Sequence, residues 1–185
     1  MVAYFQLQPA ETELQELADE YWIKSGQKER ELEQAAFEAG EAIREGEHTL
    51  GNLEAVVRWK SERAVHYLIA NSSEKIRKAL AIAANPESAT EAAMKALLEL
   101  QGVDLPVASA ILAAIFPERY TVLDFRTLEA LGHARHDVHF YEEYLAFCKR
   151  LAESNVVKPQ DGVPAPSPLR TLERALGEWS RRYIP

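Results

Sequence analysis

Apolar residues recur along most of the chain at the three- and four-residue spacing of amphipathic helices. Such a stripe lets a helix bury one face and expose the other. We expect helices over residues 12–26, 27–44, 53–68, 72–84, 88–100, 125–131, 140–153 and 167–185. Only Tyr120–Leu123 has the composition of a strand. The sequence therefore predicts an all-α fold.

Turn residues and charge divide the chain into four expected parts. Residues 1–50 are expected to form an acidic helical hairpin, and residues 51–153 a helical core. Residues 154–166 contain three prolines and a glycine, which is typical of a linker. Ser167 followed by Pro168 is a helix start signal, so residues 167–185 are expected to pack on the core as a C-terminal helix.

The charge is distributed unevenly along the chain. Residues 1–50 contain 12 acidic and 4 basic residues, which accounts for the whole net charge of −8. Residues 51–82 are mildly basic. The acidic segment, residues 1–50, is either a solvated helical face or a surface for a protein partner or a second copy. The basic segment, residues 51–82, is either neutral scaffold or a strip that faces a polyanion.

The sequence lacks the marks of a secreted or membrane protein. The acidic N-terminus has no basic start followed by an apolar run, and no apolar stretch reaches membrane-spanning length. The single cysteine, Cys148, excludes an internal disulfide and a cysteine-ligated cluster or zinc finger. We therefore expect a cytoplasmic protein with no membrane contact and no cofactor.

Residues 97–131 combine features that can serve chemistry. A turn at residues 101–103 joins one helix to a second helix rich in small residues, and Asp124 follows where a third helix begins. A glycine turn before a helix can direct free backbone N–H groups at a phosphate without recognising base sequence. The alternative is an ordinary pair of packed helices.

A set of residues in this stretch matches a known pattern. It consists of Gly102, Val103, Ala108, Ile111, Leu112, Val122 and Asp124. With the run from Phe116 to Asp124, this pattern resembles the helix–hairpin–helix superfamily of DNA base-excision glycosylases, of the endonuclease III and adenine-glycosylase type. The resemblance covers residues 92–131. It implies a glycosylase-like helical fold with the acidic hairpin as an N-terminal extension.

The resemblance implies that Asp124 assists the cleavage of an N-glycosidic bond. In that family the aspartate stabilises the cationic sugar left as the base departs, or activates the nucleophile that captures it. The implied partner is damaged or abasic DNA, from which the base must first leave the stack. The structural alternative for Asp124 is an N-cap of the following helix, and both roles are compatible.

Two substitutions depart from the family pattern. Pro106 stands where bifunctional members have their lysine nucleophile, so an active protein is expected to be of the monofunctional type. Asp104 replaces the second glycine of the hairpin, where its carboxylate faces phosphate unfavourably. The alternative function is therefore a non-catalytic nucleic-acid-binding or protein-interaction module on the same scaffold.

A second cluster of candidates lies at residues 58–63. Arg58, Trp59 and Arg63 suit nucleic-acid binding, with Trp59 available to stack on a base. Lys60 is a candidate for the missing nucleophile. The alternative is a surface tryptophan covered by the stems of Arg and Lys side chains. Arg126, two residues beyond the aspartate, is expected to pair with that carboxylate or with a phosphate.

Two further groups are more consistent with structure than with chemistry. His133, His136 and His139 share a three-residue spacing, but no fourth metal ligand is evident and an arginine stands among them. We therefore expect no metal site. Cys148 lies on an apolar helical face, which favours a core position over a nucleophile.

Overall fold

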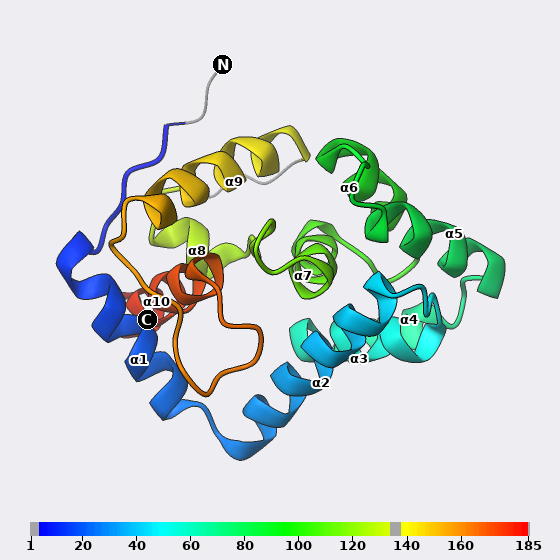
Figure 1. The fold of residues 1–185 in the computed structure, drawn as a ribbon, viewed down its shortest axis with the longest axis horizontal. Helices are drawn as coiled ribbons and strands as arrows, with labels where there is room; N and C mark the ends of the chain where they lie inside the picture. The colour runs from blue at the N-terminus through cyan, green and yellow to red at the C-terminus, as the bar shows by residue number, and fades with distance from the viewer. Residues whose placement is uncertain (1–3, 134–137, 185) are drawn as a thin grey trace. The chain divides into compact units, whose positions relative to one another are not determined.

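The computed structural model describes residues 4–133 and 138–184, and all regular structure within them is helical, as predicted. The elements are η1 (Glu11–Glu13), α1 (Leu14–Lys24), α2 (Gln27–Arg44), α3 (Leu50–Lys60), η2 (Glu62–Ala64), α4 (Val65–Leu68), α5 (Ser73–Ala84), α6 (Thr90–Leu98), α7 (Leu105–Ile115), α8 (Phe125–Glu129), α9 (Val138–Glu153) and α10 (Pro168–Tyr183) (Figure 1). They form two compact units: a terminal unit of residues 1–26 and 117–185, and a central unit of residues 27–116. None of the described helices combines the length and apolar character needed to cross a bilayer.

Helix α7 is the packing centre of the central unit. It contacts α2, α3, α5 and α6, which lie around it in Figure 1. Every residue from Val107 to Ile115 is buried. A helix that is buried on all sides needs apolar or small residues on all sides, and this stretch of α7 has them. The helix that follows the candidate turn is therefore held on several faces.

Small residues let α2 and α7 cross with their backbones in contact. A Cβ added to Gly40 of α2 would lie 2.1 Å from the carbonyl oxygen of Ala114 and 2.3 Å from its carbonyl carbon. One turn further along α2, Arg44 Nη1 donates to the carbonyl of Ile115 at 3.1 Å. This bond satisfies a carbonyl at the end of α7 that has no partner within the helix. The crossing fixes the position of α7 against α2.

Helix α10 is the packing centre of the terminal unit, where it contacts α1, α8 and α9. Its start agrees with the sequence signal. Ser167 Oγ accepts the N–H of Arg170 at 3.1 Å, and Pro168 occupies the first turn. Because proline has no N–H to lose and a suitable φ, it is well tolerated there.

The strand-like segment Tyr120–Leu123 is buried, but it has no regular secondary structure and no described strand pairs with it. Two tyrosines of α9 donate hydrogen bonds to backbone carbonyls of this segment, which a neighbouring strand would otherwise satisfy. The hydroxyl of Tyr141 donates to the carbonyl of Thr121 at 3.0 Å, and that of Tyr144 to the carbonyl of Val122 at 2.7 Å. Burial raises the pKa of both tyrosines well above its ordinary value, so both hydroxyls remain donors. The segment that leads into α8 is therefore held in place.

The expectation of one helix over residues 53–68 is wrong at Ser61. Helix α3 ends at Lys60, and Ser61 is extended, with φ −155° and ψ 94°. The segment then continues as η2 and α4. No glycine or proline marks the break, so the apolar spacing alone did not show it. The break separates residues 62–68 from α3.

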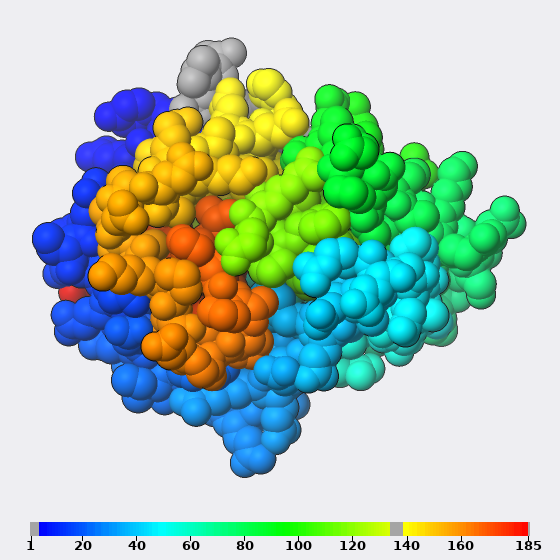
Figure 2. Space-filling view, in the orientation of Figure 1, coloured from blue at the N-terminus to red at the C-terminus, as the bar shows by residue number. Residues whose placement is uncertain are grey.

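The expected division of the chain differs from the observed one in two places. Helix α1 packs against α10, whereas α2 packs against α3 and α7, so residues 1–50 do not form a hairpin of their own. An apolar stripe does not specify which partner covers it. Residues 154–166 are packed rather than loose, because buried Gln160 accepts from Arg174 at 2.9 Å and donates to Asp19 at 2.9 Å. In Figure 2 this run, in orange, covers part of the surface of the terminal unit.

Candidate functional site

The turn between α6 and α7 is built around Gly102. This residue has a φ of 87°, in the left-handed region that favours glycine. A Cβ added there would lie 2.9 Å from the carbonyl oxygen of Ala64 and 3.0 Å from Cβ of Tyr67. Glycine is therefore required by the backbone conformation and by the packing of the turn against η2 and α4. The structure confirms the turn predicted at residues 101–103.

The side chain of Asn71 holds this turn against the end of α4. Its Nδ2 donates to the carbonyls of Leu68 and Gln101, both at 3.0 Å. Its Oδ1 accepts the N–H of Gln101 at 2.9 Å. One buried amide thus replaces a backbone pairing between two segments that lie 30 residues apart in the chain.

The turn leaves three backbone N–H groups without an acceptor among the described residues. They belong to Gly102, Asp104 and Leu105. Asp104 is the N-cap of α7, since its Oδ1 accepts the N–H of Val107 at 3.0 Å. Free N–H groups at the start of a helix favour the binding of an anion such as a phosphate. The negative charge of the Asp104 carboxylate repels such an anion. The sequence resemblance to the glycosylases did not predict this capping role of Asp104.

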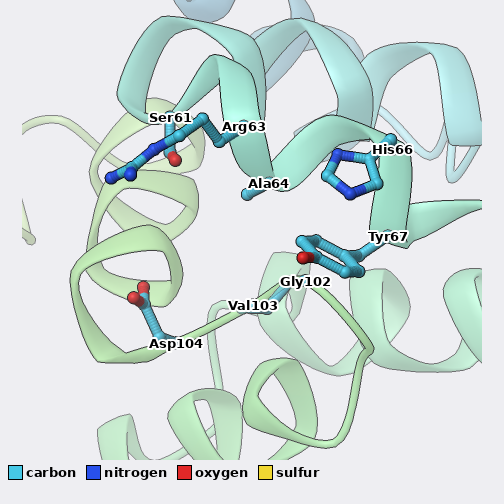
Figure 3. Close-up of a pocket in the computed structure, with 8 residues that line it drawn as sticks. All are labelled: Ser61, Arg63, Ala64, His66, Tyr67, Gly102, Val103 and Asp104. Carbon is cyan, nitrogen blue, oxygen red and sulfur yellow. The ribbon is translucent and has the colours of Figure 1, made fainter.

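A pocket of about 710 Å³ opens beside the turn (Figure 3). Its walls are formed by residues of the 61–67 segment and by residues 102–104. In Figure 3 the side chains of Arg63 and Asp104 lie toward one end of the pocket, and the rings of His66 and Tyr67 lie at the other. The pocket therefore offers a cation, an anion and an aromatic wall, all from the central unit.

Of the predicted basic cluster, Arg63 is the member that lines the pocket. Its guanidinium is exposed and makes no ion pair within the part of the chain that the structure describes. Arg58 lies 3.4 Å from a carboxylate oxygen of Glu62, one turn further along the chain. An exposed pair of this kind contributes little to stability, yet it partly neutralises Arg58. Arg63 is thus the stronger candidate for binding an anion.

The other two members of the cluster lie at the end of α3. The ring of Trp59 packs against Phe37 of α2, with centroids 5.4 Å apart. This contact favours the packing interpretation over a stacking platform for a base. Lys60 is the last residue of α3, directly before Ser61, which lines the pocket. Its role as a nucleophile stays a prediction.

Asp124 lies in the terminal unit and is the N-cap of α8. Its Oδ1 accepts the N–H of Thr127 at 3.0 Å, and the hydroxyl of Thr127 accepts the N–H of Asp124 at 3.0 Å. Arg126 Nη1 donates to Ser180 Oγ at 3.4 Å, and its guanidinium lies 4.9 Å from the ring centroid of exposed Phe125. The capping role is therefore confirmed, and the role in bond cleavage stays a prediction.

The histidines and the cysteine have structural surroundings. His133 contacts the carbonyl of Tyr4, and His139 lies 3.6 Å from a glutamate of its own helix. His136 lies outside the described residues. Among the described residues no group of three or more side chains is arranged to hold a metal. Burial raises the pKa of Cys148 to about 12, so its thiol is protonated and unreactive at neutral pH.

Sequence patterns did not single out three residues of this region. His66 and Tyr67 belong to a segment that was interpreted as one continuous helix, and Asn71 follows the end of that segment by three residues. The sequence contained one signal for Asn71, which is the run of polar residues 71–73 after the apolar end of that segment. The approach of His66, Tyr67 and Asn71 to Gly102 depends on tertiary packing and has no local signature.

Replacing Asn71 by alanine is expected to lower the free energy of unfolding by about 2–3 kcal/mol. The change removes three hydrogen bonds in a buried position, each worth about 0.5–1.5 kcal/mol. Urea denaturation of the wild type and the variant measures the loss. Asn52→Ala is the matched control, because this amide donates one exposed bond to Glu47, and a change below about 1 kcal/mol is expected. Equal effects of the two substitutions would contradict the clamping role of Asn71.

Comparisons of the chain with protein-family models, curated protein sequences and solved structures found no match.

Proposed function

We propose that the protein binds nucleic acid at the turn pocket and cleaves an N-glycosidic bond with the help of Asp124, as a divergent helix–hairpin–helix DNA glycosylase. The observation that carries the proposal is the turn itself. Unaccepted N–H groups at Gly102, Asp104 and Leu105 occur together with a pocket that also contains Arg63. Backbone N–H groups and a guanidinium are the donors with which proteins hold a sugar-phosphate chain.

The chemical step follows from the carboxylate of Asp124. Departure of the base breaks the bond between the sugar C1′ and the base nitrogen, and the base takes the electron pair. The sugar is left as an oxocarbenium-like cation, which a fixed carboxylate stabilises. Water then adds to C1′ and loses a proton, the departed base takes up a proton, and the products are the free base and an abasic site. Pro106 offers no amine for a covalent intermediate, so this monofunctional course is the one proposed.

Two observations support the second candidate, a non-catalytic binding module on the same scaffold. Asp104 places a carboxylate at the turn, where it opposes a phosphate. Asp124 already has a structural task, because it caps α8. On this alternative both carboxylates stabilise helix starts, and the pocket binds a strand without releasing a base from it.

An excision screen separates the two candidates. Labelled oligonucleotides that carry different damaged bases are incubated with the protein and then treated with alkali, which cleaves the strand at abasic sites. The glycosylase proposal expects a cleaved product from at least one substrate. Strand binding with no product from any substrate would favour the non-catalytic module, and the absence of both would contradict the proposed function as a whole.

A further inference from the structure

The aromatic wall of the turn pocket is its most unusual feature. The rings of His66 and Tyr67 lie against each other, with centroids 3.9 Å apart and planes tilted by 37°. Both residues are exposed, and Tyr67 retains 56% of its accessible surface. Two residues further on, Ile69 is also exposed, at 73%. A cluster of exposed apolar side chains beside a pocket commonly marks a binding surface.

The polar groups of the pocket suit a ligand with both charge and hydrogen-bonding edges. Arg63 offers a guanidinium that has no ion-pair partner among the described residues, and Ser61 directs its hydroxyl into the pocket (Figure 3). Asp104 offers a carboxylate oxygen beyond the one that caps α7. A bare phosphate would satisfy the cation and be repelled by the carboxylate. A nucleotide has a flat base for the rings, N–H groups for the carboxylate and a phosphate for the guanidinium.

The same groups argue against a regular duplex as the preferred ligand. The backbone of a duplex presents phosphates and keeps the faces of its bases stacked inside, where His66 and Tyr67 have no access to them. Duplex affinity depends on several cationic contacts, whereas the net charge of this chain is −8. Stacking on aromatic rings needs an unpaired base, and it stabilises single-strand complexes whatever the base sequence.

We infer that the turn pocket takes an unpaired nucleotide of a single strand, with its base stacked on the His66–Tyr67 pair and its phosphate at Arg63. This inference rests on the proposed function and narrows its substrate to bases that are already outside a duplex. Such bases do not have to be extruded from a stack before they bind. The aromatic pair therefore favours a single strand over a duplex.

The test is the binding of a labelled twelve-residue oligonucleotide, measured by fluorescence anisotropy. Single-stranded DNA, single-stranded RNA of the same sequence and the corresponding DNA duplex are compared with the wild-type protein. Tighter binding of either single strand than of the duplex supports the inference, and the tighter of the two identifies the source of the nucleotide. Because Arg63 supplies few phosphate contacts, affinity for the single strand is expected to fall less than about tenfold between 50 and 200 mM salt.

Variants of the aromatic wall make the test specific. Tyr67→Ala is expected to weaken single-strand binding by about fivefold or more, and Tyr67→Phe to stay within about twofold of the wild type, because stacking needs the ring and not the hydroxyl. Tyr183→Ala is the matched control, since Tyr183 is 55% exposed, in the terminal unit. Circular dichroism of each variant verifies that the helices are retained.

The outcomes separate this inference from the proposed function. Binding of the duplex at least as tight as that of the single strands, or single-strand binding that Tyr67→Ala leaves unchanged, overturns the inference and leaves nucleic-acid binding in place. Failure to bind any of the three ligands overturns the proposed function along with it.

Discussion

An Asp124→Asn variant is expected to lose at least about 100-fold of the rate of base excision while it remains folded. The proposed reaction builds positive charge on the sugar, and an amide cannot stabilise that charge as a carboxylate does. Losses of 10²–10³-fold are usual when a single group that stabilises transition-state charge is removed. The measurement is the single-turnover rate of abasic-site formation on the substrate identified by the excision screen.

The asparagine is chosen because it separates chemistry from capping. Asn is as good an N-cap as Asp, so its side-chain oxygen still accepts the N–H of Thr127, and the stability of α8 is retained. Asp124→Ala removes both roles and is expected to cost about 1 kcal/mol of stability in addition to activity. If Asp124→Asn excises bases at the wild-type rate, Asp124 is a helix cap alone.

Replacing Gly40 by alanine is expected to cost about 3–5 kcal/mol of stability. The added carbon would lie 2.1 Å from the carbonyl oxygen of Ala114 and 2.3 Å from its carbonyl carbon. Both atoms belong to the backbone of α7, so no side-chain rotation relieves the overlap and the two helices must separate. Because domains of this size are stable by only about 5–15 kcal/mol, the midpoint of urea denaturation should fall sharply.

Gly51→Ala is the matched control for this prediction. Gly51 is also a helical glycine, but the nearest atom to an added Cβ is Thr49 Oγ1 at 4.0 Å. Alanine there is expected to raise stability by up to about 1 kcal/mol, because it has the higher helix propensity. A Gly40→Ala variant as stable as the wild type would show that α2 and α7 do not cross in backbone contact.

The sequence predicted the helices well because most of them carry local signals. Ser167 was identified as a cap, and it accepts an N–H of the first turn of α10 in the structure. The turn at Gly102 was identified by its glycine between two apolar stretches. These features depend on residues that are neighbours in the chain, so pattern and propensity are sufficient to find them.

The parts that were not predicted depend on contacts between distant segments. The break at Ser61 has no glycine or proline, and the tyrosine hydroxyls that hold residues 120–123 come from α9, about 20 residues further along the chain. The separation of α1 from α2 into different units follows from which apolar faces match. Neither spacing nor composition contains that information.

The candidate site divides in the same way. Gly102, Val103 and Arg63 were predicted, and they line the pocket. His66 and Tyr67 were missed, although they provide its aromatic wall. Their importance arises only because the turn packs against α4, some 35 residues away in the chain. A family resemblance identifies only residues that match the family pattern. The structure identifies further pocket residues, such as His66 and Tyr67, that match no pattern.

A charge reversal at Arg63 tests most directly whether nucleic acid binds at the turn pocket. Affinity for a labelled single strand is measured for the wild type, for Arg63→Glu and for Arg77→Glu, a matched reversal at an exposed arginine of α5 that does not line this pocket. At least a tenfold loss is expected for Arg63→Glu and a loss below about threefold for Arg77→Glu, because a contact at the site outweighs a screened charge. Equal losses in the two variants, or no loss in either, would contradict binding at this pocket.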